Sequence, residues 1–129
     1  MTARSSSGVD QVVLARVLEA LADLGDIEMQ RRLWVHGSST EMSDLNEVVS
    51  MLYDDSGLGD ALLRRRQIFS IVIDDDLRRL DRHLRPYVAK WRDLSAAERA
   101  LEIESENWSR LRVEAQRLLS EVQKFRLTD

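Results

Sequence analysis

The fold is decided by the stretch SAAERALEIESENWSRLRVEAQRLLSEVQKF, residues 95–125. A four-three spacing runs through it and places its members on one face of an α-helix. The apolar members are Ala97, Leu101, Trp108, Leu111, Ala115, Leu118, Val122 and Phe125, with Glu104 as the polar member between Leu101 and Trp108. Ser95 and Glu98 have the spacing of a capping box, which indicates where the helix begins. We therefore expect one continuous helix whose apolar face packs against a partner helix, in this chain or in a second copy.

The composition of the chain favours an all-α protein. Its 129 residues are 43% hydrophobic and 33% charged, which is enough for one domain with a modest core. One proline and five glycines leave long stretches without turn signals, as helices require. The sequence contains no cysteine, which excludes disulfides, thiolate nucleophiles and cysteine-bound metal sites.

Three shorter helical patterns occupy the first half of the chain. Residues 9–24 repeat apolar side chains on one face, and Gly25 follows as a stop signal. Asp26 is placed to cap a second helix. Ser43, with Asn46 and Glu47 after it, is expected to open a third, short helix. This helix carries the apolar residues Leu45, Val48, Val49, Leu52 and Tyr53.

The second half of the chain carries two longer patterns. One begins near Asp60, taken as its cap, and is expected to end at Arg85, because proline disfavours helical geometry in the residue before it. Residues 86–94 then connect it to the C-terminal helix. The prediction is an all-α bundle of about five helices, with the two long C-terminal helices forming an antiparallel hairpin. Residues 1–8 are expected to form a disordered tail, and residues 9–129 a single helical domain.

Charge and hydropathy bear on location and partners. The formal net charge is −4, whereas sequence-independent nucleic-acid binding depends on clustered lysine and arginine. No run approaches the roughly 18 apolar residues that span a bilayer, and a signal-peptide pattern is missing from the N-terminus. We therefore expect a cytoplasmic protein without a membrane partner. Lys90 and Lys124 are the only lysines, and this preference for arginine is typical of GC-rich bacterial genomes.

Two acidic segments have some features of a metal site. Asp74, Asp75 and Asp76 are consecutive, so on a helix they point about 100° apart and do not converge on one ion. Their spacing favours i,i+4 ion pairs on a solvated face: Asp74–Arg78, Asp75–Arg79 and, further along, Asp81–Arg85. Residues 54–60 have part of the spacing of a calcium loop, but Arg65 stands where such a loop requires glutamate. The sequence thus predicts no metal and no other cofactor.

The sequence offers no set of residues for catalysis. His36 and His83 are the only histidines, and the residues three positions before them are leucines. This excludes the Glu-x-x-His pairs of ferritin-like bundles. Nothing places two carboxylates in one cleft, as acid–base catalysis by a carboxylate pair requires. We therefore expect a protein that is not an enzyme.

Candidate binding residues are aromatic or lie on the C-terminal apolar face. Tryptophan is enriched at binding hot spots, although core packing is the alternative for all three tryptophans here. The predicted partner-binding set is Trp34, His36, Trp91, Trp108, Leu111, Leu118, Val122 and Phe125. The expected partner is another protein or, as a coiled-coil homodimer, a second copy of the chain.

Three hypotheses for function remain open. The first is a non-enzymatic helical protein-interaction or dimerisation module. The second is a small DNA-associated transcriptional regulator that uses a helix-turn-helix-like unit at residues 26–53 or an arginine stripe, although acidic residues on the second helix and between the arginines weaken this reading. The stripe consists of Arg64, Arg65, Arg66, Arg78, Arg79, Arg82 and Arg85. The third is a small-ligand sensor with a pocket near Trp34, His36 and Trp91.

Overall fold

The computed structural model describes residues 11–35, 45–55 and 57–128, and every element in these ranges is helical. The helices are α1 Gln11–Leu24, α2 Ile27–Met29, α3 Leu45–Val49, α4 Leu58–Leu63, α5 Ile71–Trp91, α6 Ala96–Ile103 and α7 Glu106–Thr128, and the π-helical turns η2 Gln30–Val35 and η3 Ser50–Asp55 extend α2 and α3. The prediction of an all-α fold is confirmed. Within the described ranges, none of the helices combines the length and the apolar character needed to cross a bilayer.

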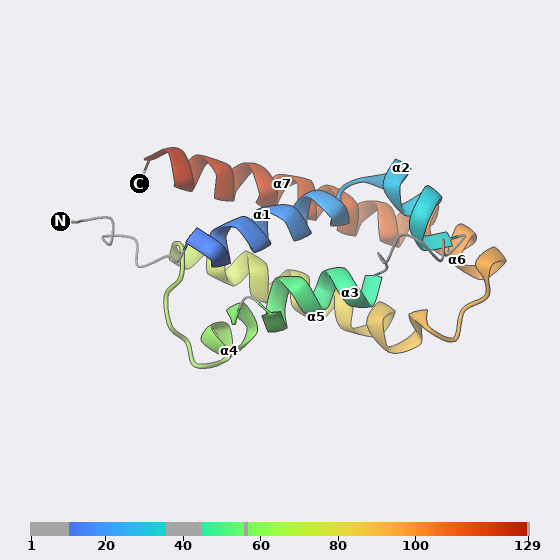
Figure 1. Cartoon of the computed structure of the whole chain (residues 1–129), viewed down its shortest axis with the longest axis horizontal. Helices are drawn as coiled ribbons and strands as arrows, with labels where there is room; N and C mark the ends of the chain where they lie inside the picture. Colours follow the sequence, from blue (N-terminus) through green and yellow to red (C-terminus); the bar gives the residue numbers. More distant parts are fainter. Residues whose placement is uncertain (1–10, 36–44, 56, 129) are drawn as a thin grey trace.

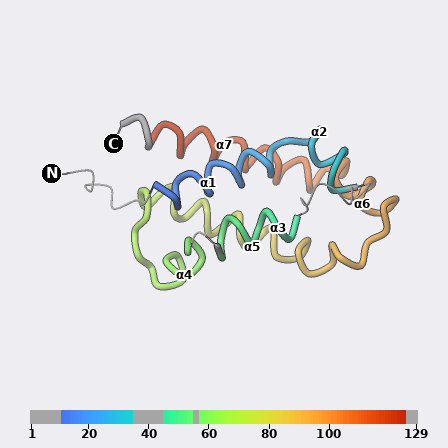
Figure 2. Tube along the Cα trace, viewed as in Figure 1, coloured from blue at the N-terminus to red at the C-terminus, as the bar shows by residue number. Residues whose placement is uncertain are grey.

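The long helices α1, α5 and α7 lie along the bundle (Figure 1). α5 runs from left to right in this view, α6 follows at the right end, and α7 returns in the opposite direction, a path that can be traced in Figure 2. α7 packs against both α1 and α5. The shorter helix α3 also packs against α1 and α5. α4 packs against η3 at the lower left of Figure 1.

The apolar face of α7 is buried inside this chain. Its core residues are Trp108, Leu111, Ala115, Leu118 and Val122, none of them more than 7% exposed. Phe125 is partly buried and meets Phe69 edge to face, with 5.4 Å between the ring centroids. The predicted spacing is therefore realised from Trp108 onward, and the helices that cover it are α1 and α5.

The prediction of one continuous C-terminal helix is wrong, because the helix breaks at Glu104 and Ser105. Ser105 caps the second piece: its Oγ accepts a hydrogen bond from the backbone N–H of Trp108 at 3.1 Å. The break changes which face of α6 is buried. Ile103 is 1% exposed, whereas Leu101, a member of the predicted face, is 75% exposed.

Two of the three predicted helix caps within the described residues are confirmed. Ser95 and Glu98 form the capping box at the start of α6, with each side chain bonded to the other residue's backbone N–H. Asp26 Oδ1 accepts a backbone N–H of α2 at 3.1 Å. The prediction for Asp60 is wrong, since this residue lies in the first turn of α4 and the cap position belongs to Gly57.

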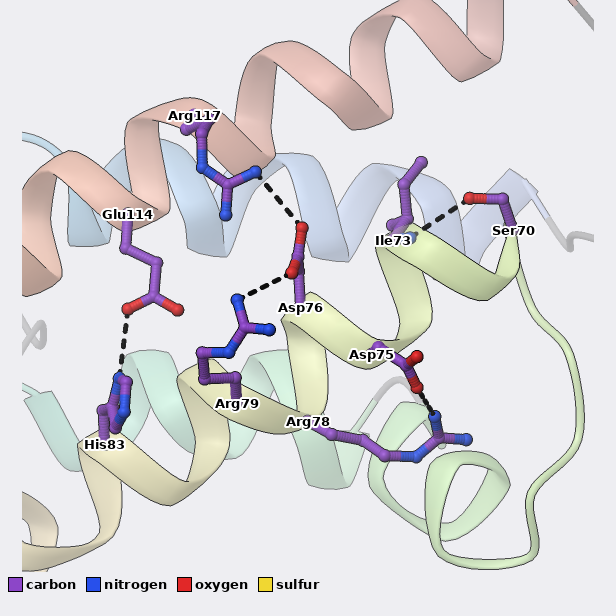
Figure 3. Close-up of polar contacts among 9 residues, drawn as sticks. All are labelled: Ser70, Ile73, Asp75, Asp76, Arg78, Arg79, His83, Glu114 and Arg117. Atoms are coloured by element: carbon purple, nitrogen blue, oxygen red, sulfur yellow. Dashed lines mark hydrogen bonds and ion pairs between the residues drawn. The ribbon is translucent and has the colours of Figure 1, made fainter.

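The predicted helix from Asp60 to Arg85 is interrupted between α4 and α5. The carboxylate of Asp74 accepts hydrogen bonds from the backbone N–H groups of Ile68 at 2.8 Å and Phe69 at 3.1 Å. These bonds hold the connection in a non-helical path, and Ser70 then caps α5 (Figure 3). Local capping thus outweighs the apolar pattern that runs through this segment.

The prediction that Pro86 ends the helix is also wrong, because α5 continues to Trp91. Proline inside a helix leaves the carbonyl four residues earlier without its N–H partner. Here Pro86 and Arg82, the residue that carries this carbonyl, are both exposed, so water can reach the helix at this point. The residues assigned to a connector, 86–94, instead carry Tyr87 and Trp91 toward the interior.

The three consecutive aspartates do not form a solvated face as predicted. Asp74 is 2% and Asp76 is 7% exposed, and only Asp75 faces water. The observed ion pairs are Asp75–Arg78 at 2.8 Å, Asp76–Arg79 at 2.9 Å and Asp81–Arg85 at 2.9 Å, so only the last pair matches the predicted partners. Asp76 also reaches Arg117 at 3.1 Å and thereby links α5 to α7 (Figure 3). In the part of the chain that the structure describes, no three acidic or histidine side chains group around a possible ion.

Candidate functional site

The structure places most of the predicted partner-binding residues in the core. Trp34, Trp91 and Trp108 are at most 1% exposed, and Leu111, Leu118 and Val122 are buried with them. Phe125 is partly buried, and His36 lies outside the described residues. The three tryptophans are therefore packed in the core, which was the alternative to a binding role for them. A partner at this set would have to replace contacts that the chain already makes with itself.

The tryptophans form one cluster that joins η2, α5 and α7. Trp34 meets Trp91 and Trp108 edge to face, with ring centroids 6.2 Å and 6.1 Å apart. Trp91 and Trp108 stack at 6.0 Å with an angle of 22° between their planes, and Tyr87 packs on Trp108 at 5.0 Å. Where the hypothesis of a small-ligand sensor places a pocket, between Trp34 and Trp91, the structure shows these rings packed against each other.

Gln30 is a key polar residue of this cluster that the sequence analysis missed. Its side chain is fully buried, and its Nε2 donates to the backbone carbonyls of Asp23 at 3.0 Å and Leu24 at 2.8 Å. Its Oε1 accepts the indole N–H of Trp108 at 2.8 Å. The available signal was its position four residues before Trp34, which places both on one helical face.

His83 is half-exposed, and its Nδ1 lies 3.2 Å from a carboxylate oxygen of Glu114 (Figure 3). Figure 3 shows this contact between α5 and α7 beside the Asp76–Arg117 ion pair. The two contacts join the same pair of helices on their polar sides, so a bond between helices accounts for this histidine.

An open groove of about 400 Å³ lies between α4 and α5. It is lined by Tyr53, Asp54, Gly59, Asp60, Leu62, Leu63, Arg65, Arg78, Asp81, Arg82 and Arg85. Three of its arginines, Arg78, Arg82 and Arg85, are four and three residues apart and so lie on one face of α5. They belong to the arginine stripe seen in the sequence, and the structure adds that this part of the stripe borders a depression.

Only part of the positive charge in the groove is neutralised within the chain. Arg78 pairs with Asp75 and also donates from Nε to the Leu62 carbonyl at 3.2 Å, which ties the end of α4 to α5. Arg85 pairs with Asp81 at 2.9 Å. The other two arginines of the groove, Arg65 and Arg82, are exposed and form no ion pair within residues 11–35, 45–55 and 57–128.

The buried groove residue Tyr53 is held by a hydrogen bond to α5. Tyr53 is 2% exposed, and its hydroxyl donates to the carbonyl of Leu77 at 2.7 Å. Burial, followed by the nearby Asp81 carboxylate, raises the pKa of Tyr53 well above its ordinary value of about 10, so the phenol stays neutral and keeps donating. Gly59 allows the close approach of α4, because a Cβ there would lie 2.9 Å from the Tyr53 carbonyl oxygen.

Arg65 has an unusual backbone conformation at the edge of the groove. Its φ is 60°, in the left-handed region that favours glycine. The N–H of Arg65 donates to the Leu62 carbonyl at 3.1 Å, and that of Arg66 donates to the Ala61 carbonyl at 3.0 Å. This is a Schellman motif at the end of α4 with arginine in the position that glycine usually takes.

Large apolar side chains are exposed at both ends of the connection between α4 and α5, and one of them, Leu63, also lines the groove. Leu63 is 83%, Ile71 is 71% and Val72 is 70% exposed, and all three flank the connection between α4 and α5. Ile71 lies seven residues before Arg78, two turns away on the same face of α5. We call these three residues and the groove the α4–α5 surface.

The hypothesis of a DNA-reading unit at residues 26–53 depends in part on residues 36–44, which lie outside the described residues. In the described part of its second helix, Glu47 is exposed and acidic. Comparison of the chain with family models, with curated proteins and with solved structures gives no match. The surfaces of this molecule are therefore the basis for inferring its function.

Proposed function

We propose that this chain is a non-enzymatic protein-interaction module whose contact region is the α4–α5 surface. The single observation that carries the proposal is the exposure of Leu63, Ile71 and Val72 around one short connection. Exposed apolar groups bordered by polar residues are typical of protein-binding sites. The C-terminal apolar face, in contrast, already has its partners in α1 and α5.

The construction of this surface supports the same proposal. Asp74 fixes the α4–α5 connection through two backbone hydrogen bonds, and Arg78 holds the end of α4 through the Leu62 carbonyl. A surface that is ordered before binding loses less conformational entropy when a partner arrives. The exposed side chains are thus presented on a fixed backbone.

Site-specific photo-crosslinking tests this proposal. A benzoylphenylalanine is introduced in place of Leu63 or Val72, and as a matched control in place of Leu101, which is 75% exposed on α6. After irradiation in an extract of the source cells, we expect one discrete protein adduct at each of the two α4–α5 positions and none at the control. The adduct at Leu63 should disappear when Ile71 is replaced by aspartate.

The mass of the adduct distinguishes two forms of the proposal. An adduct of twice the mass of the chain identifies dimerisation through the α4–α5 surface, and any other discrete mass identifies a different protein. Equal adducts at all three positions, or none at Leu63 and Val72, contradict the proposal.

A further inference from the structure

The α4–α5 groove offers positive charge that the chain does not use itself. Among its lining carboxylates, Asp81 pairs with Arg85 at 2.9 Å and Asp60 pairs with Arg64 at 3.1 Å. These ion pairs leave two arginines, Arg65 and Arg82, against the lining carboxylate of Asp54. The groove therefore has a local excess of positive charge in a chain whose formal net charge is −4.

The backbone of Arg65 provides an independent sign that this charge serves a ligand. A residue other than glycine in the left-handed conformation costs about 1 to 2 kcal/mol. The exposed guanidinium of Arg65 gains no ion pair in the described part of the chain that would offset this cost. The Schellman hydrogen bonds of this turn would form equally well with glycine, so they do not explain why an arginine stands here. Strain of this kind is concentrated at functional sites in proteins. The position at the groove edge thus points to a contact outside the chain.

We propose that the α4–α5 groove binds an acidic amphipathic helix of a partner protein. This inference rests on the proposed function and names the chemistry of its partner. Carboxylates of the partner pair with the guanidinium groups of Arg65 and Arg82, a geometry that permits two parallel hydrogen bonds for each pair. Apolar side chains on the same face of the partner helix cover Leu63 and Ile71.

The placement of the arginines and the open form of the groove also favour an elongated partner. The arginines on α5 repeat at four and three residues, so they follow one line along the helix. Arg78 and Arg85 on this line already pair with Asp75 and Asp81. The acidic residues of a partner helix therefore meet Arg82 on α5 and Arg65 at the end of α4. An open groove suits such an elongated ligand better than a small molecule, which proteins usually enclose.

Selection from a displayed library of random peptides, each about four helical turns long, tests the chemistry without assuming a partner. We expect the selected peptides to be rich in aspartate and glutamate spaced three or four residues apart, with apolar residues between them. Replacing Arg82 with glutamate should weaken their binding by about tenfold or more, because the attraction between Arg82 and a peptide carboxylate is replaced by repulsion.

A control variant separates the site from the general field of the protein. Arg16→Glu changes the net charge by the same amount on α1, where Arg16 is exposed and has no ion pair within the described residues. Its binding to the selected peptides should stay within about twofold of the unchanged protein. An equal loss in Arg16→Glu and Arg82→Glu, or selected peptides that are neutral or basic, overturns the inference.

Arg65→Gly gives the sharpest result, because folding and binding should respond in opposite directions. Glycine removes the backbone strain, so we expect the melting temperature to rise by about 3 °C. The same change should weaken peptide binding by about fivefold, because one guanidinium is lost. A rise in melting temperature with unchanged binding overturns the role of Arg65. If the peptide experiments fail while the crosslink at Leu63 persists, the proposed function stands and the acidic partner is wrong.

Discussion

At the right end of Figure 1, η2, the end of α5 and the start of α7 enclose three tryptophans that are at most 1% exposed. At the left end, α4 and the start of α5 leave Leu63 and Ile71 more than 70% exposed. The first end buries apolar area and stabilises the bundle, while the second carries strain at Arg65 and stabilises it less. The difference separates the part of the molecule that maintains the fold from the part that we propose binds a partner.

The largest predicted effect concerns the aromatic end. Trp108→Ala removes ring contacts with Trp34, Trp91 and Tyr87, and we expect it to lower the free energy of unfolding by about 3–5 kcal/mol. Urea denaturation followed by circular dichroism measures this loss. Leu101→Ala, at an exposed position, should change the same quantity by no more than about 0.5 kcal/mol. Similar losses in the two variants would break the comparison between interior and surface.

Gln30→Leu tests whether the aromatic end also depends on its polar contacts. The variant keeps much of the buried volume but leaves the indole N–H of Trp108 and the Leu24 carbonyl without the bonds that Gln30 supplies. We expect a loss of about 1–3 kcal/mol in urea denaturation. Combining it with Trp108→Phe in a double-mutant cycle isolates the Gln30–Trp108 bond. Additive losses would show that this bond contributes nothing.

Two neighbouring aspartates sharpen the comparison within α5. Asp76 is 7% exposed and bridges Arg79 and Arg117, whereas Asp75 is exposed and pairs only with Arg78. We expect Asp76→Asn to cost about 1–2 kcal/mol, a figure reduced because both of its arginines are half-exposed. Asp75→Asn should cost less than about 0.5 kcal/mol in the same urea titration. The reverse order would contradict the assignment of Asp76 as the link between α5 and α7.

The smallest predicted effect belongs to the exposed pair Arg31–Glu104, whose closest approach is 2.6 Å. A hydrogen bond from Arg31 holds the pKa of Glu104 below its ordinary value of about 4.5. A carboxylate with a lowered pKa in the folded state adds stability above the unfolded pKa, and this contribution disappears as the pH falls through the folded pKa. In Glu104→Gln, the melting temperature should therefore fall slightly less between about pH 7 and about pH 3. An identical acid profile, or one insensitive to salt in the unchanged protein, would argue against this pair.

The C-terminal apolar face shows how far periodicity reaches. Spacing alone predicted the buried residues from Trp108 to Val122, because one side of a regular helix must meet the core. It failed at Ser105, since a serine cap inside a continuous pattern looks the same as a serine on the solvent side of a helix. The error at Pro86 has a related cause. The rule that proline ends a helix takes no account of exposure, and here Pro86 and Arg82, the two ends of the missing hydrogen bond, are both exposed to water.

The α4–α5 surface was only partly predictable. The arginine stripe was evident from the positions of the arginines in the sequence. Which of them is neutralised depends on side-chain geometry: Arg78 pairs with Asp75, whereas Arg82 has no ion pair within the described residues. The turn at Arg65 lacked the glycine that normally marks the end of a helix, so no signal indicated it. The exposure of Leu63 and Ile71 follows from a connection fixed by Asp74, a contact across a turn that spacing rules do not describe.

The gathering of all tryptophans at one end of the bundle gives the molecule a built-in regional optical probe. Indole emission reports the surroundings of Trp34, Trp91 and Trp108, whereas circular dichroism averages over every helix. Melting curves from the two signals coincide if the bundle unfolds as a single cooperative unit. A dichroism curve that starts to fall first would reveal fraying of helices outside the aromatic end while that end is still closed.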